Sequence, residues 1–173
     1  MNKARNTAST ASKSDAKTDT HLNARRYLRL PLAAPSAVRY LNGDPATRTF
    51  VLSPRIAGTL LNVGAGGALV VCEHAPQPGE LLALELSLSD EFTFGGVLGK
   101  VKRVEPDTEG GFLVGIEFGT LANLCPERAE WQLPPGVVRS DSAFREALHH
   151  LLFTMEVGRR ECIQRLESEE AED

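Results

Sequence analysis

Hydrophobic and polar residues alternate in several short segments between residues 36 and 118. In residues 81–88 every even position is leucine, and residues 112–118, FLVGIEF, repeat the alternation with larger side chains. Successive side chains of a strand point to opposite faces, so a period of two indicates strands with one face in a core. We therefore predict half-buried antiparallel strands in this part of the chain.

Turn residues divide the same region into about six strands. AVRYL and TRTFVL flank the sequence NGDPA, in which Asn42-Gly43 predicts the turn of a hairpin. Residues 97–105, VLGKVKRVE, lead into the turn sequence PDTEGG. Many short strands separated by glycine and proline are typical of barrels and sandwiches. The pattern predicts a mainly β fold, a small antiparallel β-barrel over residues 21–120.

The pattern changes after residue 120. Residues 121–139 contain three prolines and the only tryptophan, Trp131, and predict an irregular connector that packs on the barrel. In residues 140–167 apolar side chains recur every three or four positions, which predicts a C-terminal α-helix. Residues 168–173 predict a frayed acidic tail.

The predicted helix carries its own signals. Ser140 or Asp141 can cap its start, and Gly158 weakens its middle by roughly 1 kcal/mol relative to alanine. Its apolar stripe either packs on the barrel, which we favour, or pairs with a helix of another subunit. The stripe consists of Phe144, Leu148, Leu151, Leu152, Met155, Cys162, Ile163 and Leu166.

Charge is distributed unevenly along the chain. The net charge is −4, but residues 1–29 carry +5 and residues 141–173 carry −5. Residues 1–20 offer little apolar surface to bury and predict a disordered N-terminal tail without a signal peptide. The three cysteines lack the spacing of a disulfide or zinc framework, and no segment reaches roughly 18 consecutive apolar residues. These features predict a cytoplasmic protein with no membrane span.

Several function classes find little support. A general nucleic-acid binder needs a broad basic face, whereas Phe92 and Phe94 stand beside the acidic Asp90 and Glu91, so we predict no nucleic-acid partner. The chain has no P-loop, nucleophile elbow or HExxH motif. We therefore predict no enzymatic activity and no cofactor. An enzyme would instead require a deep pocket with paired titratable groups.

Two groups of residues have a loose resemblance to metal ligands. His149 and His150 are adjacent on the predicted helix, so their side chains diverge by about 100° and cannot share a metal. Cys72 and His74 have no third ligand nearby in the sequence. We interpret all four as structural residues and predict no metal site.

Two other segments suggest an anion-binding site. LLNVGAGGALVV, residues 60–71, predicts two strands joined by a glycine-rich turn, in which Gly64, Gly66 and Gly67 permit a positive φ and close approach to the backbone. Amides in such a turn can bind an anion. RRYLRLPL, residues 25–32, places three arginines where the polar tail meets the first strand. Considered separately, residues 60–71 could be a purely structural turn, and the arginines of residues 25–32 could be the charges of a solvated linker.

Together the segments resemble the PilZ domain family, bacterial receptors for cyclic di-GMP. The family carries an RxxxR motif before the barrel and a [D/N]xSxxG motif on the following strands. In this chain the first is Arg25-Arg26-Tyr27-Leu28-Arg29 and the second is Asn62-Val63-Gly64-Ala65-Gly66-Gly67. GKVKRVEPDTEGGFLVGIEF is also similar to the penultimate hairpin of the family. The resemblance covers about residues 23–120 and implies the β-barrel fold.

The resemblance also implies cyclic di-GMP as the ligand and a set of binding residues. An arginine fork can bond bidentately to guanine O6 and N7 or pair with phosphate oxygens, and lysine cannot supply that planar fork. Asn62 would bond a guanine edge, and the glycines would let the nucleotide lie close to the backbone. The implied ligand-binding residues are Arg25, Arg26, Arg29, Asn62, Gly64 and Gly67.

One position departs from the family pattern, because Gly64 stands where the family has serine. One lost hydrogen bond costs about 0.5–1.5 kcal/mol, roughly a three- to tenfold change in affinity. We expect a receptor whose arginine segment orders over the ligand and alters the surface shown to a protein partner, through the C-terminal helix or the barrel. The alternative is an adaptor that keeps the barrel, does not bind cyclic di-GMP and acts by protein–protein interaction.

Overall fold

The computed structural model describes residues 29–88 and 92–170, with the side chains of the C-terminal helix as far as residue 165. The predicted disordered tail, residues 1–20, lies outside this range, as do Arg25 and Arg26. The predicted acidic tail lies beyond the last described side chain.

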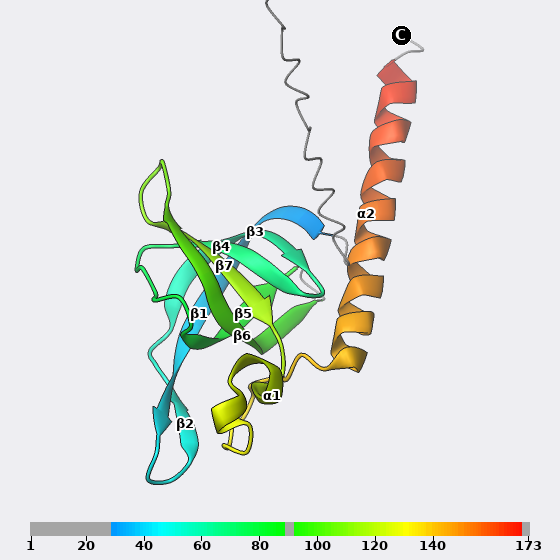
Figure 1. Cartoon of the computed structure of the whole chain (residues 1–173). Helices are drawn as coiled ribbons and strands as arrows, with labels where there is room; N and C mark the ends of the chain where they lie inside the picture. The colour runs from blue at the N-terminus through cyan, green and yellow to red at the C-terminus, as the bar shows by residue number, and fades with distance from the viewer. Residues whose placement is uncertain (1–28, 89–91, 171–173) are drawn as a thin grey trace, which may run out of the picture.

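Seven antiparallel strands form one sheet that closes on itself (Figure 1). Their order is β2-β1-β3-β4-β7-β6-β5, and β5 pairs back with β1, so six strands close a barrel and β2 extends β1 beyond it. The predicted mainly β class with an antiparallel barrel is confirmed. The strands are β1 Arg29–Asp44, β2 Thr49–Leu52, β3 Ile56–Gly64, β4 Gly67–Cys72, β5 Leu81–Ser87, β6 Thr93–Pro106 and β7 Phe112–Phe118.

The β1–β2 hairpin forms, but its turn is not at Asn42-Gly43. Both residues belong to β1 and pair with β2, and the turn lies at residues 45–48. The Asp44 carboxylate stabilises this turn by accepting hydrogen bonds from Ala46 N at 2.9 Å and Thr47 Oγ1 at 2.8 Å. The turn therefore forms after Asp44 and not at Asn42-Gly43, because the Asp44 carboxylate satisfies two hydrogen-bond donors of the turn.

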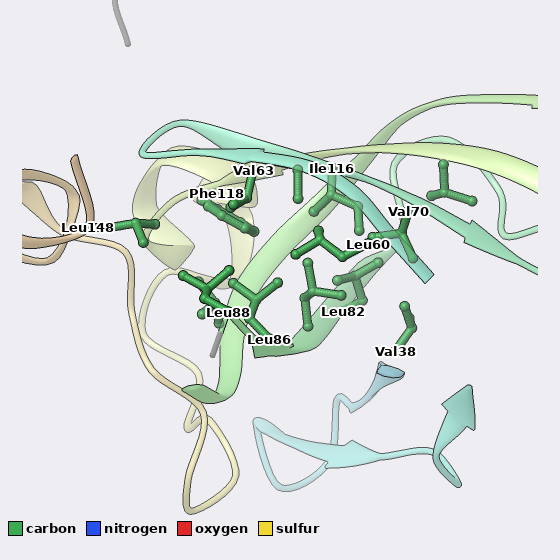
Figure 2. Close-up of a cluster of buried hydrophobic side chains, with 14 of the residues drawn as sticks. Val38, Leu60, Val63, Val70, Leu82, Leu86, Leu88, Ile116, Phe118 and Leu148 are labelled. Atoms are coloured by element: carbon green, nitrogen blue, oxygen red, sulfur yellow. The ribbon is translucent and has the colours of Figure 1, made fainter. Parts of the chain in front are cut away.

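The barrel interior holds the main hydrophobic core (Figure 2). The predicted leucine face of residues 82–88 is buried, and so are the inward residues of β7 at 114, 116 and 118. The period of two was therefore a correct guide to the core. Labelled members of this core are Val38, Leu60, Val63, Val70, Leu82, Leu86, Leu88, Ile116, Phe118 and Leu148.

The connector after β7 covers a second core on the outer face of the barrel. It contains the short helix α1, Leu121–Leu124, and the 3-10 helix η1, Pro126–Arg128. Trp131 packs against Phe50, with ring centroids 5.2 Å apart. A Cβ atom on Gly43 would lie 2.7 Å from the Trp131 ring, so this glycine serves packing. The buried members of this second core are Leu41, Phe50, Leu81, Ala83, Leu98, Leu121, Leu124 and Cys125.

The C-terminal helix α2, Ser142–Glu170, begins against the open end of the barrel and extends past it (Figure 1). Asp141 provides the predicted cap, because its Oδ1 accepts a hydrogen bond from Phe144 N at 2.9 Å. Leu148 and Leu152 are fully buried in the barrel core, and Phe144, Leu151 and Met155 pack against it.

The predicted stripe therefore packs on the barrel over its first half only. Cys162 is exposed and Ile163 is 41 % exposed, while the side chain of Leu166 lies outside the described residues.

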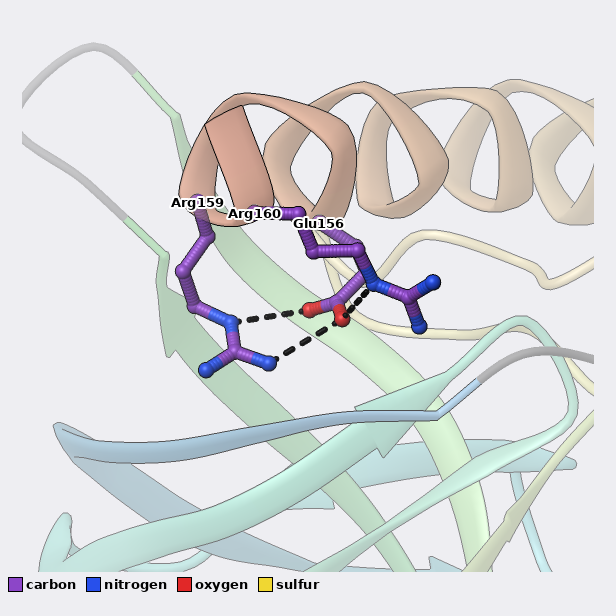
Figure 3. A network of polar contacts seen from close by, with 3 residues as sticks. All are labelled: Glu156, Arg159 and Arg160. Atoms are coloured by element: carbon purple, nitrogen blue, oxygen red, sulfur yellow. Dashed lines mark hydrogen bonds and ion pairs between the residues drawn. The ribbon is translucent and has the colours of Figure 1, made fainter. Parts of the chain in front are cut away.

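A polar network marks the place where α2 leaves the core (Figure 3). Glu156 is only 8 % exposed, and its carboxylate accepts hydrogen bonds from Arg159 Nε and Nη2, each at 3.0 Å, and from Arg160 Nε at 2.8 Å. A carboxylate this poorly solvated needs such donors, and the two arginines supply them from the next turn of the same helix.

Candidate ligand-binding site

The last arginine of the N-terminal motif lies beside the glycine-rich turn. Arg29 opens β1 and pairs in register with Gly64 at the end of β3, and Gly64 pairs with Gly67 across the two-residue turn to β4. Gly67 in turn pairs with Glu117 of β7. Residues directly opposite each other share a face of the sheet, so these positions form one row across four strands.

A second row runs beside the first. Asn62 of β3 pairs with Leu69 of β4, Leu69 with Gly115 of β7, and Gly115 with Arg103 of β6. Leu69 and Gly115 are partly exposed, whereas their neighbours along the strands are buried. The row therefore lies on the outer face of the barrel, with an amide at one end, a guanidinium at the other, and Leu69 and Gly115 between them.

A β-bulge adds a second cation to the end of this row. The register between β6 and β7 shifts between Val101 and Arg103, so Lys102 is an extra residue on β6. Both Lys102 and Arg103 are exposed, although adjacent residues of a regular strand would point to opposite faces. The bulge thus brings two consecutive cations to the same outer face.

These elements enclose a cleft of about 460 Å³ on the outer face of the barrel. That volume lies within the range of small-molecule sites, roughly 300–1,000 Å³. Its floor comes from β4 and β7 and its walls from β1 and β6. The lining residues are Arg29, Gly66, Gly67, Ala68, Leu69, Lys102, Arg103, Gly115, Ile116 and Glu117.

Of the two predicted reasons for the glycines at this cleft, a positive φ is wrong, and close approach to the backbone is seen at Gly67. Gly64, Gly66 and Gly67 do not adopt a positive φ; the positive-φ glycines of the described residues lie elsewhere. A Cβ atom on Gly67 would collide with the backbone oxygen of Ile116, and one on Gly115 would lie 2.7 Å from Arg103 Cγ. Gly67 and Gly115 are therefore needed for close packing, and their bare backbone leaves room for a ligand.

The charged groups of the cleft form weak ion pairs. Lys102 Nζ lies 3.0 Å from Glu117 Oε2, and Arg103 Nη1 lies 3.4 Å from Glu105 Oε1. All four side chains are about half exposed, and exposed pairs of this kind contribute only about 0–1 kcal/mol. Because each pair is weak, an anionic ligand could compete with the carboxylate for the cation.

The cleft contains some of the predicted site residues and not others. Arg29 and Gly67 line it, and Asn62 borders it through its partner Leu69. Gly64 is buried and does not line the cleft. Arg25 and Arg26 lie outside the described residues, so their roles stay predictions.

Lys102 and Arg103 were missed by sequence reasoning. They stand in GKVKRVE, which reads as an ordinary strand with alternating polar residues. The sequence contains one indication, the two adjacent basic residues that interrupt the alternation. This indication was not enough, because a pattern of residue types does not show whether a strand contains a bulge.

The cysteine and histidine residues that loosely resembled metal ligands lie elsewhere in the fold. The Cys72 thiol donates a hydrogen bond to the backbone oxygen of His74 at 3.1 Å, and burial raises the pKa of this thiol. His149 and His150 lie along a shallow groove of α2 with Phe153. The described residues hold no cluster of three or more histidine, cysteine or acidic side chains that could bind a metal. Nor, over the same residues, is any helix both long and apolar enough to cross a bilayer.

Comparisons with known proteins agree with this architecture. The chain is similar to the crystal structure of YcgR in complex with c-di-GMP from Escherichia coli, with 12 % identity and a TM-score of 0.55 over 82 % of this chain and 50 % of that one. It is also similar to the PilZ domain of the same protein with c-di-GMP, with 14 % identity and a TM-score of 0.49 over 81 % of this chain and 97 % of that one.

These similarities support only a limited conclusion. At such identities the first comparison concerns the fold alone, and the chain spans about half the length of the YcgR chain. No curated protein sequence matches the chain. The model of the PilZ domain, however, matches residues 23–125, which include both motifs and all seven strands. The chain therefore belongs to the PilZ domain family.

Proposed function

We propose that this protein is a receptor for cyclic di-GMP and that the ligand binds in the cleft between β1 and β6. The observation that carries the proposal is the register of Arg29 opposite Gly64, which joins the end of the arginine motif to the glycine turn of the second motif. Family membership and the flat, partly cationic cleft support it.

The residues suit the chemistry of this ligand, which has two phosphates and two guanines. Arg29 is exposed at the mouth of the cleft and can reach a phosphate or the Hoogsteen edge of a guanine. Asn62 offers a donor and an acceptor on the same face. By the family motif, Arg25 and Arg26 complete the arginine segment, and the backbone of Gly64 and Gly67 admits the nucleotide.

Binding would transmit a signal without chemistry on the ligand. We propose that the arginine segment closes over the nucleotide and that this ordering changes the surface near the start of β1. Leu30 and Val63, the neighbours of Arg29 and Asn62, belong to the same core as the first half of α2. A protein partner would read the changed surface of the barrel or of α2.

Calorimetric titration of cyclic di-GMP into the 173-residue chain tests the receptor. We expect micromolar or tighter binding, and the double variant Arg25→Ala/Arg29→Ala should weaken it by at least about 100-fold, since each charge-assisted contact contributes roughly 1.5–3 kcal/mol. Equal thermal melting of the two proteins without ligand would show that the variant is folded. Unchanged affinity in the variant would refute the arginine role.

A second function is favoured by one observation. Gly64 is buried and carries no hydroxyl where the family has serine, which is a feature expected of an adaptor that no longer binds the nucleotide. If the wild-type chain gives neither heat nor a thermal shift with cyclic di-GMP, the adaptor becomes the better explanation, and a protein partner would be its ligand.

A further inference from the structure

We infer that Lys102 and Arg103 form a second cationic arm of the ligand site, which holds the nucleotide from the side opposite Arg29. Lys102 would bind a phosphate, and Arg103 would bind a guanine through its planar face or fork. This inference rests on the proposed function and adds two residues that belong to neither family motif.

The bulge on β6 is the first argument. A regular strand would turn one of the two side chains into the barrel, where Val101 and Val104 already point inward or pack against the core. The extra residue instead keeps both cations outside and next to each other. Bulges commonly redirect side chains beside functional sites.

The position of Arg103 is the second argument. Its aliphatic part and Nε lie directly over Gly115, since a Cβ atom there would be 2.7 Å from Arg103 Cγ and 3.1 Å from Nε. The aliphatic part of the side chain therefore lies across the floor of the cleft, while the guanidinium stays accessible in a side chain that is 59 % exposed. A guanidinium held in this way can stack on a purine or bond to its edge, which a lysine could not do.

The reach across the cleft is the third argument. In sheet order β3, β4 and β7 separate Arg29 on β1 from Arg103 on β6, about 19 Å along a flat sheet at ~4.8 Å per strand. Both residues nevertheless line one cleft, and both have long side chains. A ligand with two charged and two aromatic groups is the kind that can engage both walls at once.

The ion pairs of Lys102 and Arg103 are weak enough for a ligand to compete with them. Lys102 pairs with Glu117, which also lines the cleft, and Arg103 pairs with Glu105, which does not; both contacts are exposed and of low net stability. A phosphate can replace Glu117 as the partner of Lys102, so the exchange costs little. The additional contacts also offset the hydrogen bond that Gly64 cannot make.

Calorimetric titration of cyclic di-GMP into single variants tests the arm. Arg103→Ala should weaken binding about tenfold or more, and Arg103→Lys should recover only a small part of that loss because it restores charge without the fork. Lys102→Ala should weaken binding about three- to tenfold at about 50 mM NaCl and less at about 500 mM, since exposed charges are screened by salt.

Arg55→Ala is the matched control, because Arg55 is an equally exposed cation paired with a carboxylate, Glu85 at 2.7 Å, but lies outside the cleft. We expect wild-type affinity from it, and thermal melting within 2–4 °C of wild type for all variants without ligand, about the shift expected for 1 kcal/mol in a chain of this size.

The outcomes separate the two proposals. Wild-type affinity in both Lys102→Ala and Arg103→Ala, with binding lost in the Arg25→Ala/Arg29→Ala variant, would refute the second arm and leave the receptor intact. Full recovery by Arg103→Lys would refute the stacking or fork role. Absence of binding by the wild-type chain would refute the receptor and the arm together.

Discussion

At the scale of single residues, Gly67 shows how tightly the floor of the cleft is packed. Replacing it with alanine places a methyl group against the backbone oxygen of Ile116, which cannot move aside without distorting the β4–β7 pairing. Overpacking of this kind costs about 1–3 kcal/mol. We expect Gly67→Ala to lower the free energy of unfolding by that amount in urea denaturation.

Gly95→Ala is the matched control for this substitution. Gly95 also lies in a strand, β6, but apart from its chain neighbours no atom of the described residues lies within 4 Å of the position of an added Cβ. Alanine there should leave stability unchanged or raise it by up to about 1 kcal/mol, because it restricts the unfolded chain. A similar loss in both variants would contradict the packing role of Gly67.

Glu156 is the residue whose ionisation should be visible in stability. Hydrogen bonds from Arg159 and then Arg160 lower the pKa of its carboxyl from 4.5 to about 2. A group with a lowered folded-state pKa stabilises the protein above its unfolded pKa, and this contribution disappears as the pH falls through the folded value. The stabilisation should therefore be full above about pH 5 and be lost between about 4.5 and 2.

The variant Glu156→Gln tests this pH dependence. We expect it to be less stable than wild type at pH 7, and the difference in the free energy of unfolding should shrink steadily as urea titrations are repeated toward pH 3. A difference that stays constant over this range would show that Glu156 contributes through packing and not through its charge.

At the scale of elements, α2 consists of an anchored half and an exposed half. Leu152 is fully buried in the barrel core, whereas Ile163 lies three turns further along and is 41 % exposed. Leu152→Ala should cost about 2–5 kcal/mol in urea denaturation, as expected for a large cavity in a core. Ile163→Ala should change stability by no more than about 0.5 kcal/mol. A large loss at Ile163 would indicate that another surface covers it.

The strands show why a sequence pattern predicts the position of a strand more easily than an irregularity such as a β-bulge within it. Alternation in residues 81–88 and 112–118 predicted two strands and their buried faces, because each inward side chain follows the pleat. The bulge at Lys102 breaks the same rule over a single position. Such a break depends on the partner strand, so it is invisible in the residues of β6 alone.

At the scale of the whole molecule, two cores lie on opposite faces of shared strands. β1, β5 and β6 contribute inward residues to the barrel core and outward residues to the core beneath the connector. Disruption of one core should therefore disturb the other, and we expect the chain to unfold in a single transition.

The only tryptophan makes this expectation measurable. Trp131 packs on the outer core, so its fluorescence reports that region, while far-UV circular dichroism reports the barrel and α2. The two signals should give the same urea midpoint, and Leu152→Ala in the inner core should shift both equally. A separate, lower midpoint for Trp131 fluorescence would show that the connector unfolds on its own.

Local chemistry determined much of this protein from its sequence alone. The period of two identified the strands, the three- to four-residue period identified the helix, and the paired motifs identified the family. Ser140 and Asp141 were both named as possible caps, and the structure shows that Asp141 caps the helix. Each of these signals resides in residues close together in the chain, where backbone geometry dictates the spacing. Arg29 and Gly67 were named from the same local motifs, and both line the cleft, but their role in binding stays a prediction.

Tertiary structure alone decided the rest, because it depends on which strands become neighbours. Pairing of β1 with β3 set Arg29 beside Gly64, and pairing of β6 with β7 created the bulge that brought Lys102 and Arg103 to the same cleft. Gly43 became a packing residue only when Trp131, far along the chain, reached it. Contacts between distant segments are set by register and close packing, and neither is encoded in the local pattern of residue types.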